Sequence, residues 1–164
     1  MKAMFVGLGS IGQRHLRNLK HLRQGQPLEI FACRQNPHQL VIEDGKAHEV
    51  ESLASHYGFT ELKGIEEALS EEPDIAFICN PSSMHLPTSI LCAKKGCHLF
   101  IEKPVSTKSD GLEELEKILE QKGLVSMVGF QTRFHPLVME TFRLLKTQEY
   151  GQVLSAHFNW AAYL

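Results

Sequence analysis

The sequence has no long apolar run, no strong excess of either charge and no repeated or low-complexity segment. No stretch approaches the roughly 18 apolar residues that a membrane-spanning helix needs, and the first apolar stretch is too short for a signal peptide. The formal net charge of −2 over 164 residues argues against nucleic acid or an anionic membrane as the main partner. We therefore expect a cytoplasmic protein that binds neither nucleic acid nor membrane.

Cysteine and histidine show no pattern that would predict a disulfide framework or a metal site. Cys33 and Cys79 lie in predicted strands, and we expect all four cysteines to be reduced and mostly buried. Cys92, Cys97 and His98 come closest to a ligand cluster. Because Cys97 and His98 are neighbours in a predicted strand, their side chains point to opposite faces. We therefore expect no bound metal.

The first dozen residues carry the most informative pattern that is present. A short apolar run at residues 2–6 leads directly into a G-x-G-x-x-G motif, and a helical pattern follows. In such a motif Gly7 permits the sharp turn, Gly9 lets a pyrophosphate approach the backbone, and Gly12 lets the helix pack close to the strand. The helix N-terminus then offers free N–H groups to phosphate. The residues expected to bind a dinucleotide here are Gly7, Gly9, Ser10, Ile11 and Gly12. The alternative is a glycine turn in an unrelated α/β domain.

Strand and helix patterns alternate along most of the chain, which favours a parallel sheet covered by helices on both faces. The expected strands lie at about residues 3–7, 28–33, 59–62, 74–79, 98–101 and 125–129. The expected helices lie at about residues 11–23, 46–57, 64–70, 83–96, 110–122 and 135–147. This is an α/β fold with a Rossmann-type, doubly wound parallel sheet that is complete by about residue 129. An extended stretch is expected at residues 153–160.

Three further positions follow the predicted strands. The second strand ends in Cys33-Arg34 where an acid would bind the 2′-OH of NAD, and Glu29 lies at the wrong end of that strand. Arg34 could bind a 2′-phosphate, which favours NADP; the alternative is a solvated surface arginine. Asn80-Pro81 after the fourth strand could line a cofactor channel or form an ordinary turn before a helix. Lys103 after the fifth strand could polarise a substrate oxygen or simply be solvated.

These motifs together resemble the Gfo/Idh/MocA oxidoreductases, the group of glucose–fructose oxidoreductase and inositol dehydrogenase. The resemblance rests on the glycine motif, Asn80-Pro81 with His85, Glu102-Lys103-Pro104, and the segment at 129–134, in that order. It implies that Lys103 is the active-site lysine, which touches the substrate hydroxyl and the nicotinamide ribose. It also implies that the cofactor is lined by Asn80, Pro81, His85 and Glu102.

The resemblance also implies a second domain, an open and mostly antiparallel sheet that holds the substrate and forms the oligomer interface. Residues 1–129 would be the NAD(P)-binding domain, and residues 130–164 the incomplete start of this α+β domain. Family members are about twice as long, and no residue here matches their acid–base aspartate and histidine; His135 and His157 precede that motif. We therefore expect the N-terminal portion of a homo-oligomeric enzyme, truncated and inactive alone.

The function that the resemblance implies is hydride transfer between NADP or NAD and a carbinol carbon of a sugar, cyclitol or nucleotide-sugar. The alternative is a non-catalytic dinucleotide-binding module or sensor. A Rossmann methyltransferase is disfavoured because no acid follows the second strand to hold a ribose.

Overall fold

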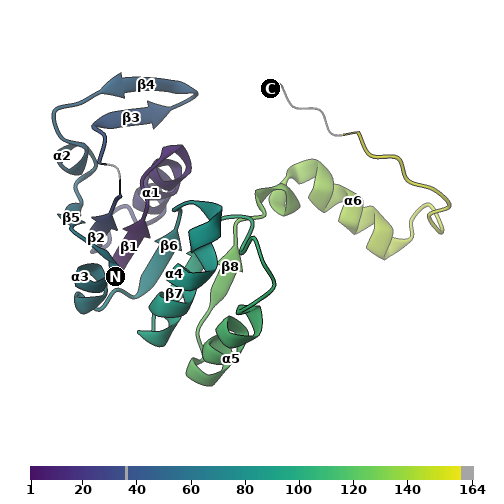
Figure 1. The fold of residues 1–164 in the computed structure, drawn as a ribbon. Helices are drawn as coiled ribbons and strands as arrows, with labels where there is room; N and C mark the ends of the chain where they lie inside the picture. Colours follow the sequence, from purple (N-terminus) through teal and green to yellow (C-terminus); the bar gives the residue numbers. More distant parts are fainter. Residues whose placement is uncertain (36, 160–164) are drawn as a thin grey trace. The chain divides into compact units, whose positions relative to one another are not determined.

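The computed structural model describes residues 1–35 and 37–159 of the chain. It contains two compact units, Met1–Gly129 and Phe130–Leu164, and each is described by itself (Figure 1). Among the described residues, no helix combines the length and the apolar character that crossing a membrane would require.

The first unit is built on a six-stranded, fully parallel sheet. The strands are β1 (Lys2–Val6), β2 (Glu29–Cys33), β5 (Thr60–Leu62), β6 (Ile75–Ile78), β7 (His98–Ile101) and β8 (Ser126–Val128). Their order is β5-β2-β1-β6-β7-β8, which confirms the predicted doubly wound sheet. The winding reverses between β1 and β6, and ligands of open α/β sheets bind outside the carboxyl ends of the strands at this point.

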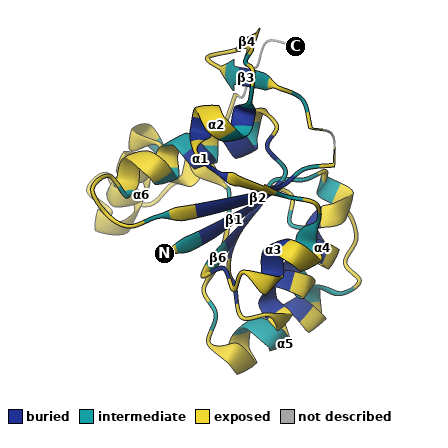
Figure 2. Cartoon of the chain, turned by 90° about the vertical axis from the view of Figure 1, so that its left-hand side faces the viewer, coloured by how far each residue is buried: buried dark blue, intermediate teal, exposed yellow. Residues whose placement is uncertain are grey.

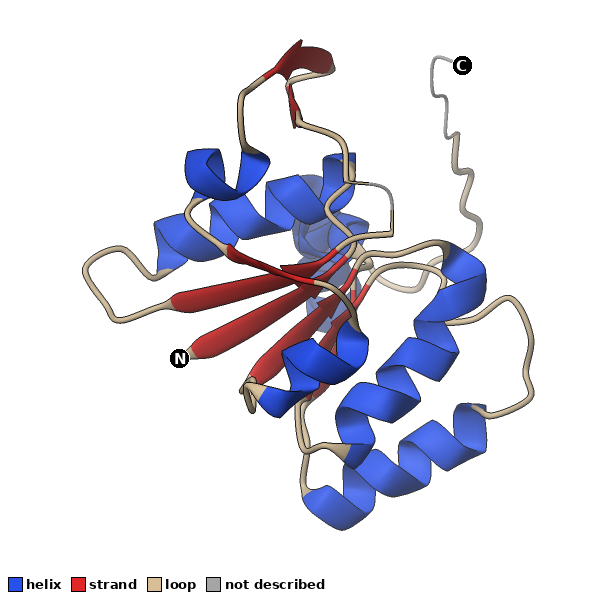
Figure 3. Ribbon diagram, turned by 60° about the vertical axis from the view of Figure 1, so that its left-hand side comes forward, coloured by secondary structure: helices blue, strands red, loops and turns tan. Residues whose placement is uncertain are grey.

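Helices cover both faces of the sheet (Figure 3). One face packs against α1 (Ser10–Leu22) and α2 (Leu53–Tyr57), and the other against α3 (Ile65–Ser70), α4 (Ser82–Lys94) and α5 (Leu112–Lys122). Neighbouring residues of β1 serve opposite faces: Phe5 joins the core with α1, and Met4 joins the core with α4. Because both faces are covered, β1 is buried from Ala3 to Val6 and β6 from Ala76 to Ile78 (Figure 2).

The prediction of a helix at residues 46–57 is wrong in its first half. Strand β3 (Leu40–Glu43) pairs antiparallel with β4 (Lys46–Glu49), and α2 begins only at Leu53. The turn residues Asp44 and Gly45 both have positive φ, at 49° and 74°. Asp-Gly with this geometry is a strong hairpin signal, and the Asp44-Gly45 dipeptide could have predicted this hairpin from the sequence.

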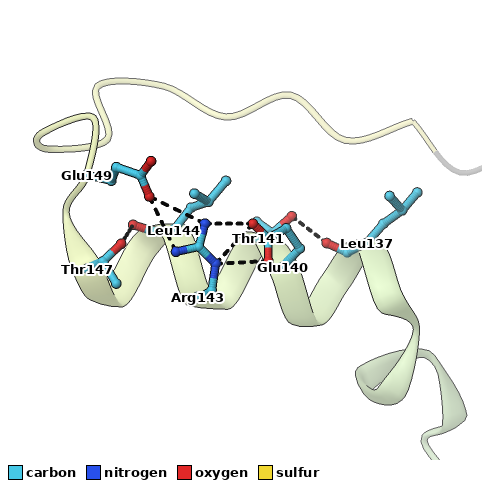
Figure 4. A network of polar contacts seen from close by, with 7 residues as sticks. All are labelled: Leu137, Glu140, Thr141, Arg143, Leu144, Thr147 and Glu149. Atoms are coloured by element: carbon cyan, nitrogen blue, oxygen red, sulfur yellow. Dashed lines mark hydrogen bonds and ion pairs between the residues drawn. The ribbon is translucent and has the colours of Figure 1, made fainter.

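The second unit contains the short 3-10 helix η1 (Gln131–Phe134) and helix α6 (Pro136–Thr147), which confirms the helix predicted at 135–147. Figure 4 shows Arg143 between Glu140, at 2.7 Å, and Glu149, at 3.3 Å. The hydrogen bonds from Arg143 lower the pKa of Glu140. The described residues 151–159 form no strand, so the predicted extended stretch does not pair into a sheet there; Trp160 lies outside the described residues.

A buried amide ties the hairpin and α2 to α1. The side chain of Gln13 is fully buried, and its Nε2 donates to the carbonyl oxygens of Leu8 and Leu40 at 3.1 and 2.9 Å. Its Oε1 accepts from the backbone N–H of Ile42 at 2.8 Å and from the Tyr57 hydroxyl at 3.1 Å. One side chain therefore satisfies four polar groups from three separate segments.

We expect Gln13→Leu to lower the free energy of unfolding by about 3 kcal/mol, because it leaves several buried polar groups without partners. Gln24→Leu, the same change at an exposed position, should cost less than about 0.5 kcal/mol. Urea unfolding followed by circular dichroism measures both. Equal effects of the two substitutions would show that the Gln13 network contributes nothing.

Candidate functional site

The glycine motif forms a tight turn between β1 and α1. Gly7 has φ +92°, and its N–H donates to the Cys33 carbonyl oxygen at 3.0 Å. A Cβ on Gly12 would lie 2.4 Å from the Gly7 carbonyl oxygen, whereas a Cβ on Gly9 would meet nothing within 4 Å. Gly7 and Gly12 are therefore required by packing, and Gly9 leaves the N-terminus of α1 open.

A cavity of about 830 Å³ lies at this turn, at the carboxyl ends of β1, β2 and β6. This is the switch point of the sheet, where the strand order reverses between β1 and β6. The N-terminus of α1 is capped by Gly9 with no side-chain hydrogen bond, so its first N–H groups remain available to an anion. The lining includes Gly7, Gly9, Arg34, Lys63, Asn80 and Pro81.

Arg34 lines this cavity, but its guanidinium is bound within the protein. Its Nε and Nη2 donate to the Glu61 carboxylate at 2.8 and 2.7 Å, and its Nη1 donates to the His38 carbonyl oxygen at 2.7 Å. Only 3% of the side chain is exposed. Arg34 is therefore not the solvated surface arginine of the alternative interpretation.

Asn80 has one unsatisfied atom at the cavity. Its Nδ2 donates to the Thr88 hydroxyl at 2.9 Å, while its Oδ1 is buried with no hydrogen-bond partner among the described residues. An unpaired buried acceptor is costly, and such atoms are satisfied by a ligand or by ordered water. Asn80 Oδ1 and the open face at Gly9 both fit a bound polar ligand.

His85 lies behind the cavity and joins two loops. The residue is 2% exposed, and its ring nitrogens lie 2.7 Å from the carbonyl oxygens of Asn80 and Pro104. Asn80 follows β6 and Pro104 follows β7. His85 therefore fixes the separation of these loops and does not line the cavity.

Glu102 pairs with a histidine that the sequence reasoning missed. Glu102 Oε1 lies 2.7 Å from His15 Nε2, and both side chains are mostly buried. The His15 ring lies 4.6 Å from the Phe100 ring, centroid to centroid. His15 lies one turn after Gly12 on α1, and no local pattern indicates its partner, because Glu102 lies 87 residues later in the chain.

Lys103 follows Glu102 at the end of β7, as predicted. Its backbone N–H donates to Glu102 Oε2 at 3.3 Å. The residue is exposed, and its ammonium makes no hydrogen bond or ion pair with the part of the chain that the structure describes.

The candidate residues fall into two groups by their position relative to the cavity. Gly7, Gly9, Arg34, Asn80 and Pro81 surround the cavity; Ser10, Ile11, Gly12, His85, Glu102 and Lys103 lie outside its lining.

Cys33 and Cys79 line the cavity as neutral thiols. Burial raises the pKa of Cys33 to about 11. Burial, and secondarily the Glu102 charge, raise the pKa of Cys79 to about 12. A nucleophilic cysteine needs a lowered pKa, so these two thiols contribute apolar surface and not covalent chemistry.

Comparison with known proteins gives a consistent result. The sequence model of the family described as "Oxidoreductase family, NAD-binding Rossmann fold" matches residues 1–130. The chain is 28% identical to 4-carboxy-2-hydroxymuconate-6-semialdehyde dehydrogenase of Sphingobium sp., over 83% of this chain and 40% of that protein. It is 26% identical to scyllo-inositol 2-dehydrogenase (NAD(+)) of Bacillus subtilis, over 93% of this chain and 42% of that protein.

The fold is also similar to solved structures. The WlbA dehydrogenase from Chromobacterium violaceum, solved with NADH and UDP-GlcNAcA, superposes with a TM-score of 0.75 at 22% identity, over 92% of this chain and 41% of that chain. The chain spans about 40% of the length of the curated relatives it matches.

We expect Gly12→Ala to lower the free energy of unfolding by about 2–3 kcal/mol, because the new methyl group overlaps the Gly7 carbonyl. Gly9→Ala should cost less than about 1 kcal/mol, since its Cβ meets open space. Thermal and urea unfolding of the two variants test this difference. If Gly9→Ala were the more damaging, the packing described for this turn would be wrong.

The raised thiol pKa values predict a loss of stability in alkali. An unfolded cysteine ionises near 9.0, whereas Cys33 ionises at about 11 when folded. Above pH 9 the unfolded state therefore binds fewer protons, and stability falls as pH rises. Cys33→Ala should remove about 1 kcal/mol of the stability difference between pH 8 and pH 10. Urea unfolding at the two pH values measures it, and an unchanged difference contradicts the assignment.

Proposed function

The chain belongs to the Gfo/Idh/MocA family of oxidoreductases, and on that premise we propose that residues 1–129 bind a nicotinamide dinucleotide for hydride transfer. The observation that carries the proposal is the cavity at the sheet's switch point, which is lined by the open backbone at Gly9 and by Asn80, whose Oδ1 is unpaired among the described residues. When bound, the nicotinamide would accept or donate a hydride.

Within this site each segment has a proposed task. The backbone from Gly9 through Ser10 and Ile11 would hold the pyrophosphate at the α1 N-terminus. Gly7 and Gly12 would keep that turn tight, and Asn80 with Pro81 would line the cofactor channel. The cavity's remaining end, at Arg34, would take the adenosine ribose. The finer prediction of NADP over NAD depends on whether the Arg34 guanidinium can reach a 2′-phosphate.

Lys103 is the proposed catalytic residue. Its exposed ammonium could donate a hydrogen bond to the reacting substrate oxygen and stabilise developing negative charge. Two contacts would position its backbone: Glu102 accepts the Lys103 N–H, and His85 is bonded to the Pro104 carbonyl on the other side. His85 and Glu102 are thus positioning residues in this proposal.

Substrate and assembly are proposed from the relatives. Scyllo-inositol 2-dehydrogenase acts on a cyclitol, as its name states, which supports a sugar, cyclitol or nucleotide-sugar as the substrate here. We propose that residues 130–164 begin the substrate domain, that the complete protein is a homo-oligomer, and that it works in the cytoplasm. None of the described residues of α6 is buried, which supports a further packing partner for this helix.

Titration of NADH and NADPH into the 164-residue chain, followed by nicotinamide fluorescence, tests the proposal. We expect saturable binding of at least one cofactor. Gly9→Ala should weaken that binding by about tenfold or more, because the methyl group stands where the pyrophosphate must approach. Its free energy of unfolding should fall by less than about 1 kcal/mol, so the chain stays folded during the titration. Absence of binding by the folded chain, for both cofactors, contradicts the proposal. Binding that Gly9→Ala leaves unchanged would place the cofactor elsewhere.

A further inference from the structure

We propose that Glu61 determines the choice of cofactor, and that by binding the Arg34 guanidinium it makes the chain prefer NAD(H) to NADP(H). This inference rests on the proposed dinucleotide site. It reverses the preference expected from the sequence, in which Arg34 was free to bind a 2′-phosphate.

The strand register brings Glu61 to Arg34. Strands β2 and β5 pair in parallel, with Ala32 opposite Glu61 and Cys33 opposite Leu62. Arg34 lies two residues after Ala32, so the two side chains emerge on the same face of the sheet. No acid follows β2 in the sequence, but Glu61 of the neighbouring strand β5, 27 residues later in the chain, lies beside Arg34.

Acceptors within the protein bind three N–H groups of the Arg34 guanidinium. Both oxygens of Glu61 accept from it, at 2.8 and 2.7 Å, and the His38 carbonyl oxygen accepts a third N–H at 2.7 Å. The guanidinium carbon also lies 5.8 Å from the centre of the Phe59 ring. A two-pronged pair of this kind is a strong charge-assisted contact. The Arg34 side chain is 3% exposed and that of Glu61 is 36% exposed; Arg34 lines the cavity beside this pair.

A 2′-phosphate arriving at this end of the cavity would therefore meet an arginine that is already paired with the Glu61 carboxylate. The two negative groups repel each other, and the repulsion is strong where water is partly excluded. Reaching Arg34 would require the phosphate to displace Glu61 and leave that carboxylate without its partner. The ribose of NAD carries a neutral hydroxyl at this position and meets no such penalty.

Two other groups at this end of the cavity could attract a phosphate. His38 lines the cavity, but its Nδ1 accepts the Leu40 N–H at 3.3 Å, so that nitrogen does not donate. Lys63 also lines the cavity. Among the described residues, its backbone N–H donates to Glu67 Oε2 at 2.8 Å, and its ammonium has no partner. Lys63 is therefore the competing ligand for a 2′-phosphate, and the experiment must separate it from Arg34.

The test is the ratio of the NADPH to the NADH dissociation constant, measured on the 164-residue chain and its variants. We expect the unmodified chain to bind NADH more tightly. Glu61→Gln keeps the shape of the side chain and removes its charge, so it should shift the ratio toward NADPH by about tenfold. The double variant Glu61→Gln with Arg34→Met should lose that gain. Glu29→Gln, at the opposite end of β2 and exposed, is the matched control and should leave the ratio unchanged.

The other outcomes overturn the inference in distinguishable ways. If both cofactors bind and Glu61→Gln leaves their ratio unchanged, Glu61 does not set the preference, although the dinucleotide site stands. If the unmodified chain prefers NADPH and Lys63→Gln abolishes that preference, Lys63 binds the 2′-phosphate. If neither cofactor binds the folded chain, the proposed function itself fails. Circular dichroism of every variant confirms that the comparison is between folded proteins.

Discussion

The close approach of α1 to the end of β1 is the constraint on which the rest of this structure depends. A single added carbon on Gly12 would lie 2.4 Å from the Gly7 carbonyl oxygen, and one on Gly7 would lie 2.8 Å from the Cys79 carbonyl oxygen. Backbone therefore packs directly on backbone where β1, β6 and α1 meet. The same closeness leaves the α1 N-terminus facing the cavity, so the packing requirement and the proposed phosphate site come from one turn.

Buried polar contacts link the glycine turn and α1 to the neighbouring loops. Gln13 holds the hairpin to the next turn of α1, and His15 extends from the same helix to Glu102 at the end of β7. His85 joins the loops after β6 and β7. These contacts connect the hairpin and the loops after β6 and β7 to α1 and to one another. Lys103 lies in the middle of this framework with its ammonium exposed.

The predictions that succeeded were those that rest on short local sequence patterns. The strands β2, β1, β6 and β7 were found as apolar runs because both faces of the sheet are covered there, whereas the edge strands β5 and β8 are mostly exposed. The glycine motif predicted the position of the turn between β1 and α1. The prediction that failed, a helix across 46–49, overlooked an Asp-Gly turn that the sequence carries in Asp44 and Gly45. The environment of Arg34 could not be predicted from the sequence, for a different reason. No property of residues 33–34 reveals that Glu61 will lie alongside, because that contact depends on the register between two strands.

The sequence by itself determined the order of elements, the α/β class and the position of the dinucleotide turn, since each follows from spacing within a dozen residues or so. Only the tertiary structure decided which polar groups meet. The pairs Arg34–Glu61 and His15–Glu102 are separated by 27 and 87 residues. The first follows from the register of β2 and β5, and the second from the packing of α1 beside the end of β7. The polar groups at the carboxyl edge of the sheet thus come from different elements, and their pairing is fixed by packing and register rather than by any local motif.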